Sequence, residues 1–216
     1  MAAHSGLNME LNQLLSFCLA SFLMAIMPGP DNLFVITESL AKGKRNGLWI
    51  AFGLNSGVLI HTLAAATGLS LILQQSELAF QVVQYLGAAY LIYLAYKAYR
   101  EKPIVFVAGE QAPATETAFQ LFRTGITMNV LNPKVSLFFI AFLPQFVRPE
   151  STVKPSIQLI VLGVLFLLVG WLTFSSFAIL VDQLRVLAQG EKFGIFSRWL
   201  KVIVLLFLGC YLLLPN

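Results

Sequence analysis

The segment "AIMPGPDNLFVIT" (residues 25–37) places two prolines, a glycine, an aspartate and an asparagine inside a run that is otherwise apolar enough to cross a membrane. Proline lacks a backbone N–H and clashes with the preceding helical turn, so a helix is expected to break here. Backbone that leaves its helix within a bilayer must be surrounded by protein or by a water-filled cavity. The segment therefore indicates a broken membrane helix with a polar site at the break.

The overall composition is also that of a membrane protein. Of the 216 residues, 58% are hydrophobic and 11% are charged, whereas soluble domains carry about a quarter charged residues. The net charge of +4 is modest, and no RNA-binding or basic-stripe motif accompanies it, so we expect no nucleic-acid partner. No zinc-type Cys/His spacing and no P-loop occurs, so we expect no metal site and no cofactor. No large soluble domain is present either, and we expect that the protein is not an enzyme.

A helix that crosses the bilayer core needs about 20 apolar residues. Six stretches meet this requirement and predict an all-α, multi-pass membrane protein: 11–36, 47–73, 79–99, 123–147, 156–181 and 195–214. The polar residues 101–121 predict a cytoplasmic linker between two three-helix repeats, 1–100 and 122–216. Most of the 14 Lys and Arg residues lie in or beside the connections after the first, third and fifth spans. The positive-inside rule places these connections in the cytoplasm and both termini on the other side, the periplasm.

The fourth predicted span contains a matching interruption, "MNVLNPKVS" (128–136). In both interruptions a proline is directly followed by an ionisable residue, as Pro30–Asp31 and as Pro133–Lys134. Because each repeat has three spans, the second repeat must run through the membrane in the opposite sense to the first. Paired interruptions at corresponding positions of inverted repeats indicate a transporter site. The residues expected to break the two helices are Pro28, Gly29, Pro30 and Pro133.

The two ionisable residues at the breaks are candidates for substrate or ion binding, because an intramembrane charge is a functional-site hypothesis by default. Asp31 could simply complement the dipole of the helix that it begins, or it could contact a substrate ammonium group or take a proton. Lys134 stands at a helix N-terminus, where a cation is disfavoured, so it requires a counter-ion. Asp31 and a substrate carboxylate are both candidates, and the sequence leaves this choice open.

The second predicted span adds a row of three residues on one helix face. Gly53, Gly57 and His61 are each four residues apart, and residues at that spacing lie above one another on a helix. The glycines predict a close contact with another helix. His61 has two interpretations, a hydrogen-bonded packing residue or a member of a proton relay. Gly163 and Gly170 in the fifth span are interpreted as packing residues.

Three motifs, in this order along the chain, resemble the LysE/RhtB family of bacterial amino-acid exporters. They are "MPGPDNLFVIT" (27–37), "GLNSGVLIHTLAAATGLS" (53–70) and "FRTGITMNVLNPKVSLFFIAFLPQFV" (122–147). The resemblance implies a secondary transporter of the bacterial inner membrane that exports small amino acids or their derivatives, using the proton gradient. It also implies functional roles for the polar residues of the motifs. Together with His61, these give the candidate substrate- or ion-binding residues: Asp31, Asn32, Asn129, Asn132, Lys134 and Gln145.

Two other functions stay open on the sequence alone. An exporter of metal ions or of another small solute would use Asp31 and His61, although such proteins usually carry clusters of ligating residues in their spans. A transmembrane redox protein would need Cys18 and Cys210, which we interpret as small buried apolar residues, to meet at the broken helices. The expected partners are the lipid bilayer, an amino-acid substrate and protons. A homo-oligomer is compatible with the glycine-rich faces, and the sequence does not specify the cargo.

Overall fold

The computed structural model describes residues 11–69, 77–100, 116–148, 151–180 and 191–213. This described part of the chain is helical and contains no β-strand. The first half contains α1 (Leu11–Ile26), α2 (Pro30–Lys42), α3 (Lys44–Ala64), the π-helical turn η1 (Ala65–Leu69) and α5 (Glu77–Arg100). The second half contains α6 (Ala118–Val130), α7 (Pro133–Leu137), η2 (Phe138–Phe142), η3 (Leu143–Phe146), α8 (Pro155–Ile179) and α10 (Glu191–Tyr211). The end of the predicted linker, residues 118–121, is thus helical.

Both predicted helix breaks are confirmed. α1 and α2 meet at an angle of 59°, and the segment that starts with α7 is bent by 50° from α6. Pro30 and Pro133 each open the second helix of their pair, a position where the missing N–H costs nothing because the first N–H groups of a helix have no intrahelical partner. The bends follow from the prolines, as the sequence indicates.

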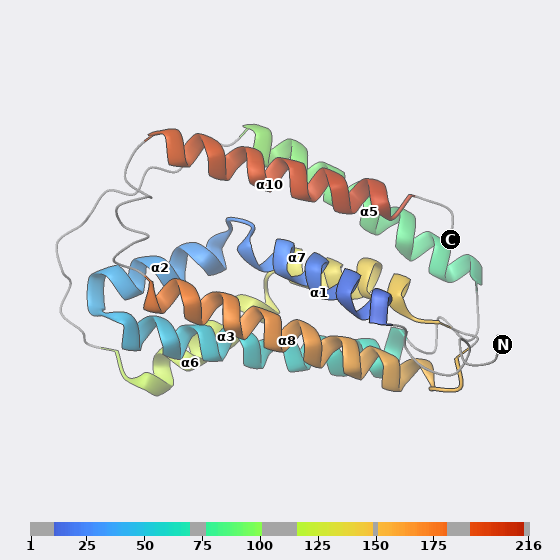
Figure 1. Cartoon of the computed structure of the whole chain (residues 1–216), viewed down its shortest axis with the longest axis horizontal. Helices are drawn as coiled ribbons and strands as arrows, with labels where there is room; N and C mark the ends of the chain where they lie inside the picture. Colours follow the sequence, from blue (N-terminus) through green and yellow to red (C-terminus); the bar gives the residue numbers. More distant parts are fainter. Residues whose placement is uncertain (1–10, 70–76, 101–115, 149–150, 181–190, 214–216) are drawn as a thin grey trace.

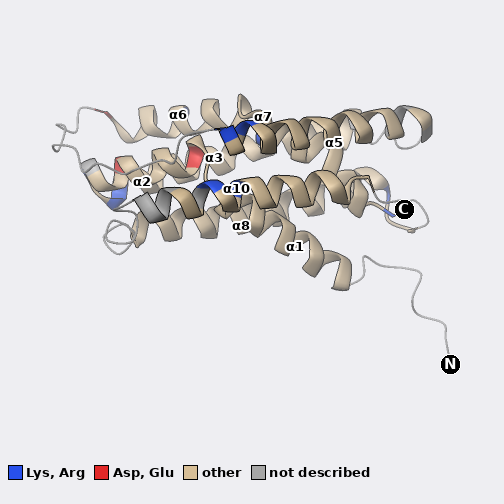
Figure 2. Cartoon of the chain, turned by 90° about the horizontal axis from the view of Figure 1, so that it is seen from above, with Lys and Arg blue, Asp and Glu red and all other residues tan. Residues whose placement is uncertain are grey.

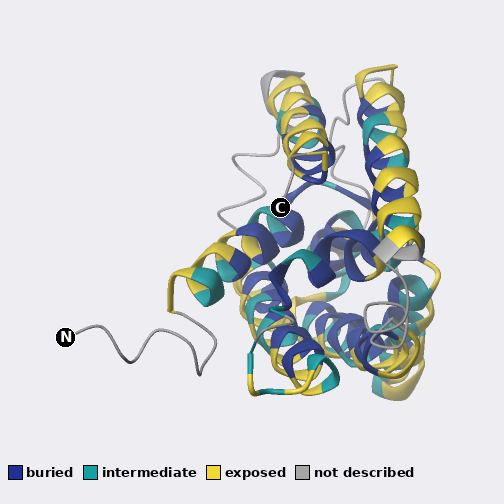
Figure 3. Ribbon diagram, turned by 90° about the vertical axis from the view of Figure 1, so that its right-hand side faces the viewer, coloured by how far each residue is buried: buried dark blue, intermediate teal, exposed yellow. Residues whose placement is uncertain are grey.

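The membrane character is confirmed for part of the predicted spans. Within the described residues, two helical stretches are long and apolar enough to cross a membrane, Lys44–Gly68 and Pro155–Ile179, and up to four if each bent pair forms one span. α5 and α10 lie in the third and sixth predicted spans. The total of six spans and the repeat architecture therefore stay predictions. The exposed residues lie mainly on the outer faces of the helices (Figure 3), and many of them are large and apolar.

The close contact predicted from the glycines of the second span is confirmed, and its partner is α6. A Cβ atom on Gly53 would lie 2.1 Å from the backbone oxygen of Phe122, and one on Gly125 would lie 2.5 Å from that of Ile50. The two backbones therefore touch, and α3 and α6 run parallel. The packing interpretation of Gly163 and Gly170 is also confirmed, since both lie on α8 against side chains of α3.

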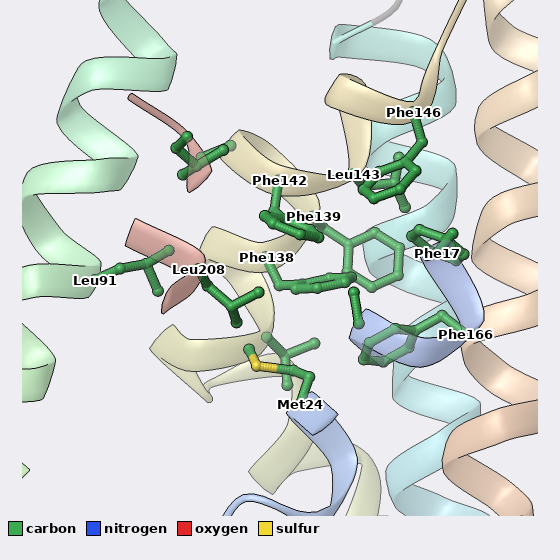
Figure 4. Close-up of a cluster of buried hydrophobic side chains, with 14 of the residues drawn as sticks. Phe17, Met24, Leu91, Phe138, Phe139, Phe142, Leu143, Phe146, Phe166 and Leu208 are labelled. Carbon is green, nitrogen blue, oxygen red and sulfur yellow. The ribbon is translucent and has the colours of Figure 1, made fainter. Parts of the chain in front are cut away.

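A second group of helices is held by aromatic packing. α5 and α10 lie side by side, apart from α3 and α8 (Figure 1). Between them and α1 lies a buried cluster built on η2, in which the ring centroids of Phe138 and Phe142 are 4.9 Å apart. Figure 4 shows Leu91 of α5 and Leu208 of α10 reaching this cluster. The aromatic run directly after the second break thus connects the two groups of helices.

The charged residues gather toward one end of the molecule (Figure 2). At this end α2 finishes, α3 and α6 begin, and Ala178 near the end of α8 lies against Gly47 of α3. The connections that follow the first and fifth predicted spans, and the start of α6, are therefore at the same end. We call it the basic end, because it carries Lys42, Lys44, Arg45 and Arg123.

Candidate functional site

The first break carries a buried carboxylate with one free oxygen. Gly29 precedes α2 and provides no side-chain cap, and Asp31 lies in the first turn of that helix. The Asp31 side chain is 1% exposed. Its Oδ2 accepts a hydrogen bond of 2.6 Å from Nδ2 of Asn132, a residue of the second break. Its Oδ1 is buried and has no hydrogen-bond partner in the described part of the chain, a costly situation that calls for a proton or an external donor.

Lys134 reaches across in the other direction, to the end of α1. Its Nζ donates to the backbone oxygens of Met24 at 3.2 Å and Met27 at 3.4 Å. In an uninterrupted helix the oxygen of Met24 would accept from residue 28, but Pro28 has no N–H to donate. Among the described residues, Lys134 forms no ion pair with Asp31 within 4.0 Å. The negative end of the α1 dipole and these two carbonyl groups thus hold the Lys134 ammonium group, which also interacts electrostatically with Asp31.

The second break repeats this arrangement with different residues. Pro133 cannot donate to the backbone oxygen of Asn129, which accepts instead from the Asn132 N–H at 3.0 Å. Nε2 of His61 lies 3.3 Å from the same oxygen, and the His61 ring packs against Phe139 with centroids 5.6 Å apart. These contacts favour the packing interpretation of His61, which ties α3 to the broken helix.

Asn132 is the residue that joins the two breaks. Its Oδ1 accepts from the backbone N–H of Lys134 at 3.0 Å and caps α7, while its Nδ2 donates to Asp31. Asn32 has a comparable role at the first break, where its Nδ2 donates to the Ala25 oxygen at 2.7 Å. The Oδ1 atoms of Asn32 and Asn129 are both buried without a described partner. Asp31 and Asn32 therefore supply unpaired acceptors in the first turn of α2, whereas the Asn129 amide lies against Gly57 of α3.

Not every candidate residue belongs to this junction. Gln145 lies in η3, at the far end of the fourth predicted span, where the carbonyl group of Phe146 accepts from Gln13 of α1. Sequence reasoning missed the carbonyl groups of Met24 and Met27 as partners of Lys134. The signal was present, because a proline that follows a helical segment leaves the carbonyl group four residues earlier without its helical donor.

An ion-pair cluster lies at the basic end, away from the junction. Nζ of Lys42, the last residue of α2, is 2.8 Å from Glu116 and 3.1 Å from Glu38. The hydrogen bonds to Glu116 and then to Glu38 raise the pKa of Lys42 above its usual range. The cluster ties the end of α2 to the segment just before α6.

Neither alternative function gains support from the described residues. No group of three His, Cys, Asp or Glu side chains within them could hold a metal ion. Cys18 lies half-buried on α1 and Cys210 on α10, and both are free. The sequence-based expectation that Cys210 is buried is wrong: it is exposed on its helix, where an apolar thiol can face lipid.

Comparison with known proteins identifies the family. The sequence profile of LysE type translocators matches residues 22–215. The chain belongs to the LysE type translocator family. The translocator is 30% identical over 190 residues to the uncharacterized membrane protein YrhP of Bacillus subtilis. The aligned region covers 85% of this chain and 90% of the relative.

Other relatives of the translocator carry functional names. A homoserine/homoserine lactone efflux protein of Salmonella typhimurium is 29% identical over 178 residues, 82% of this chain and 84% of the relative. A leucine efflux protein of Enterobacter is 27% identical over 183 residues, 83% of this chain and 86% of the relative. No solved structure matches significantly. The family consists of efflux transporters, so the translocator is a membrane transport protein and not an enzyme.

Proposed function

We propose that the translocator exports small amino acids or their derivatives from the bacterial cytoplasm across the inner membrane, in exchange for protons. The observation that carries this proposal is the junction of the two breaks, where a buried carboxylate, Asp31, has one oxygen bound to Asn132 and one oxygen free. The names of two relatives, which refer to homoserine and leucine efflux, support an amino-acid cargo.

The free oxygen of Asp31 suits an exchange mechanism. A carboxylate in a low-dielectric site is stabilised by an ammonium group or by a proton. The two compete, because a protonated carboxyl group is neutral and attracts an ammonium group only weakly. Binding of the substrate ammonium on the cytoplasmic side would therefore displace the proton, and a proton taken up on the other side would release the substrate. The free Oδ1 of Asn32, in the same first turn, adds a second acceptor for the ammonium group.

The substrate carboxylate is assigned to the start of α2. Gly29 leaves the first N–H groups of α2 without a side-chain cap, and such groups favour an anion. Lys134 acts indirectly in this scheme, because its ammonium group already holds the α1 carbonyl groups. Lys134 and Asn132 thereby keep the two breaks together, and His61 supports the second break.

The proposal includes two inverted repeats, 1–100 and 122–216, joined by a linker within 101–121. Asp31 and Lys134 occupy the same place after their breaks, the residue after a proline that opens a helix. α3 packs on α8 and α5 on α10, so corresponding helices of the two repeats are neighbours. In this arrangement the basic end faces the cytoplasm, and both termini are periplasmic.

Efflux from bacterial cells preloaded with a panel of labelled amino acids, including homoserine and leucine, tests the proposal. We expect the wild type to export at least one of them, and Asp31→Asn to lose this export at equal membrane abundance. Glu38→Gln is the matched control, because it neutralises another acid of α2 that lies outside the junction, and it should keep most of the activity. A protonophore should abolish export by the wild type.

Two results would contradict the proposal in different ways. Wild-type rates in Asp31→Asn would remove this carboxylate from the mechanism while leaving amino-acid export in place. Absence of efflux for every amino acid in the panel would refute the proposed cargo.

A further inference from the structure

An open depression of about 440 Å³ lies along α6, between the basic end and the second break. Its lining residues are spaced three or four apart on one face of that helix, and they are Glu116, Gln120, Arg123, Thr124, Thr127 and Met128. The opposite face of α6, with Leu121, Gly125 and Asn129, is buried, and its glycine touches α3. α6 thus has one face for packing and one face that is polar and open.

A polar face on a membrane helix requires water or polar ligands, because hydrocarbon cannot satisfy its hydrogen bonds. Gln120, Arg123 and Thr127 are all exposed. The depression begins beside Glu116, where Lys42 forms its ion pair, and ends at Met128, directly before Asn129 of the second break. It therefore extends along α6 from the basic end to the end of the helix that precedes the second break, on the face opposite the buried Asn129.

Arg123 is the group in this depression that can hold an anion. Its guanidinium lies over the ring of Phe119, with Cζ 5.9 Å from the centroid. Arg123 lines the depression, and the ion pairs of the described residues do not include it. A guanidinium in this state binds carboxylates in a two-pronged geometry. The nearest acid in the depression, Glu116, is already bound to Lys42.

We propose that this depression is a second substrate site, in which Arg123 captures the carboxylate of an amino acid before it reaches the junction of the breaks. Gln120 and the hydroxyl groups of Thr124 and Thr127 supply hydrogen bonds to the rest of the molecule. The junction then binds the ammonium group at Asp31. The inference rests on the proposed export of amino acids, and it adds a capture site on the side from which the cargo comes.

The capture site predicts a specific kinetic effect. In membrane vesicles with the basic end facing the substrate, we compare homoserine and leucine with their primary amides, which lack the carboxylate. Arg123→Gln should raise KM for the amino acids by roughly fivefold or more, since a charge-assisted hydrogen bond is lost, while the maximal rate changes little. KM for the amides should stay the same. Arg123→Lys should restore part of the affinity.

Arg45→Gln is the matched control. Arg45 is another exposed arginine at the basic end, in the first turn of α3, and it does not line the depression. Arg45→Gln changes the net charge by the same amount as Arg123→Gln, and it should leave KM for the amino acids unchanged.

Three outcomes would overturn the capture site. An unchanged KM for the amino acids in Arg123→Gln would show that the guanidinium does not bind the cargo. A rise in KM that is equal for amino acids and amides, and that appears only in vesicles rich in anionic lipid, would show that Arg123 binds lipid phosphate groups. A fall in the maximal rate with no change in KM would assign it a structural role. Failure of the wild type to transport any amino acid would instead refute the proposed function itself.

Discussion

Each of two prolines at the breaks leaves one backbone carbonyl group without its helical donor, and other groups take the place of that donor. Lys134 donates to the carbonyl of Met24, to which Pro28 cannot donate. The carbonyl of Asn129, to which Pro133 cannot donate, accepts from the Asn132 N–H and lies 3.3 Å from His61 Nε2. A buried carbonyl without a partner costs about 1–3 kcal/mol. The polar residues at the breaks are therefore structural partners of the prolines as well as candidates for binding.

This pairing predicts coupling between Pro28 and Lys134. Lys134→Met should destabilise the protein, since the carbonyl of Met24 loses its partner, and Pro28→Ala should restore an N–H that can bond it. In thermal or denaturant unfolding in detergent, we expect a favourable interaction of about 1 kcal/mol or more between the two substitutions. Pro30→Ala with Lys134→Met is the matched control, because Pro30 affects the carbonyl of Ile26, which Lys134 does not bind. Additive effects in the Pro28 pair would contradict this account.

The sequence predicted the positions of both breaks and the residues around them, because proline acts locally and its effect is independent of the fold. It did not predict the partner of Lys134. The expected partners were charges, Asp31 or a substrate carboxylate, whereas the structure supplies two carbonyl groups at the end of α1. The bond between Asp31 and Asn132 also required the fold, since 101 residues separate the two in the chain.

At the level of the elements, the contact between α3 and α6 depends on glycines of both helices. A Cβ atom on Gly53 would enter the space of the Phe122 carbonyl group, and one on Gly125 that of Ile50. The sequence indicated a close contact for Gly53 and Gly57, because their spacing places them on one face. It could not identify α6 as the partner, because a row of small residues indicates that another helix packs closely and does not indicate which one.

Gly53→Ala is therefore expected to be strongly destabilising. The added methyl group would force α3 and α6 apart, and overpacking of this kind costs about 1–3 kcal/mol. Gly68→Ala is the control within the same membrane span, because no described residue has an atom within 4 Å of the added carbon there. Unfolding in detergent, followed by circular dichroism, should give a lower midpoint for Gly53→Ala alone. Equal midpoints for the two variants would show that α3 and α6 accommodate the methyl group without loss of stability.

At the level of the whole molecule, the arrangement of the helices agrees with the distribution of basic residues. The start of α3, the start of α6 and the end of α8 lie together, and the described charges gather toward this end (Figure 2). The start of α8, which follows Lys154, lies at the other end of that 25-residue helix. The positions of the Lys and Arg residues predicted which connections share an end of the molecule. The packing of α5 and α10 on the aromatic cluster after the second break depends on tertiary contacts that no sequence pattern indicates.

The orientation in the membrane can be tested with single cysteines. In a background with Cys18→Ala and Cys210→Ala, we expect Lys154→Cys to react with a membrane-impermeant maleimide in intact spheroplasts. Lys44→Cys, the same substitution at the basic end, should react only after the membrane is permeabilised. Labelling of Lys44→Cys in intact spheroplasts would place the basic end outside the cytoplasm.

The backbone contact between α3 and α6 also has a mechanical consequence. Gly53 belongs to the first half of the chain and Gly125 to the second, so the two halves are joined where their main chains touch. Helices in such contact cannot slide or tilt apart without opening a void, and they must travel as a single rigid body. If the junction opens alternately to the two sides of the membrane, as proposed, we expect α3 and α6 to stay together while the helices that follow the two prolines move relative to them.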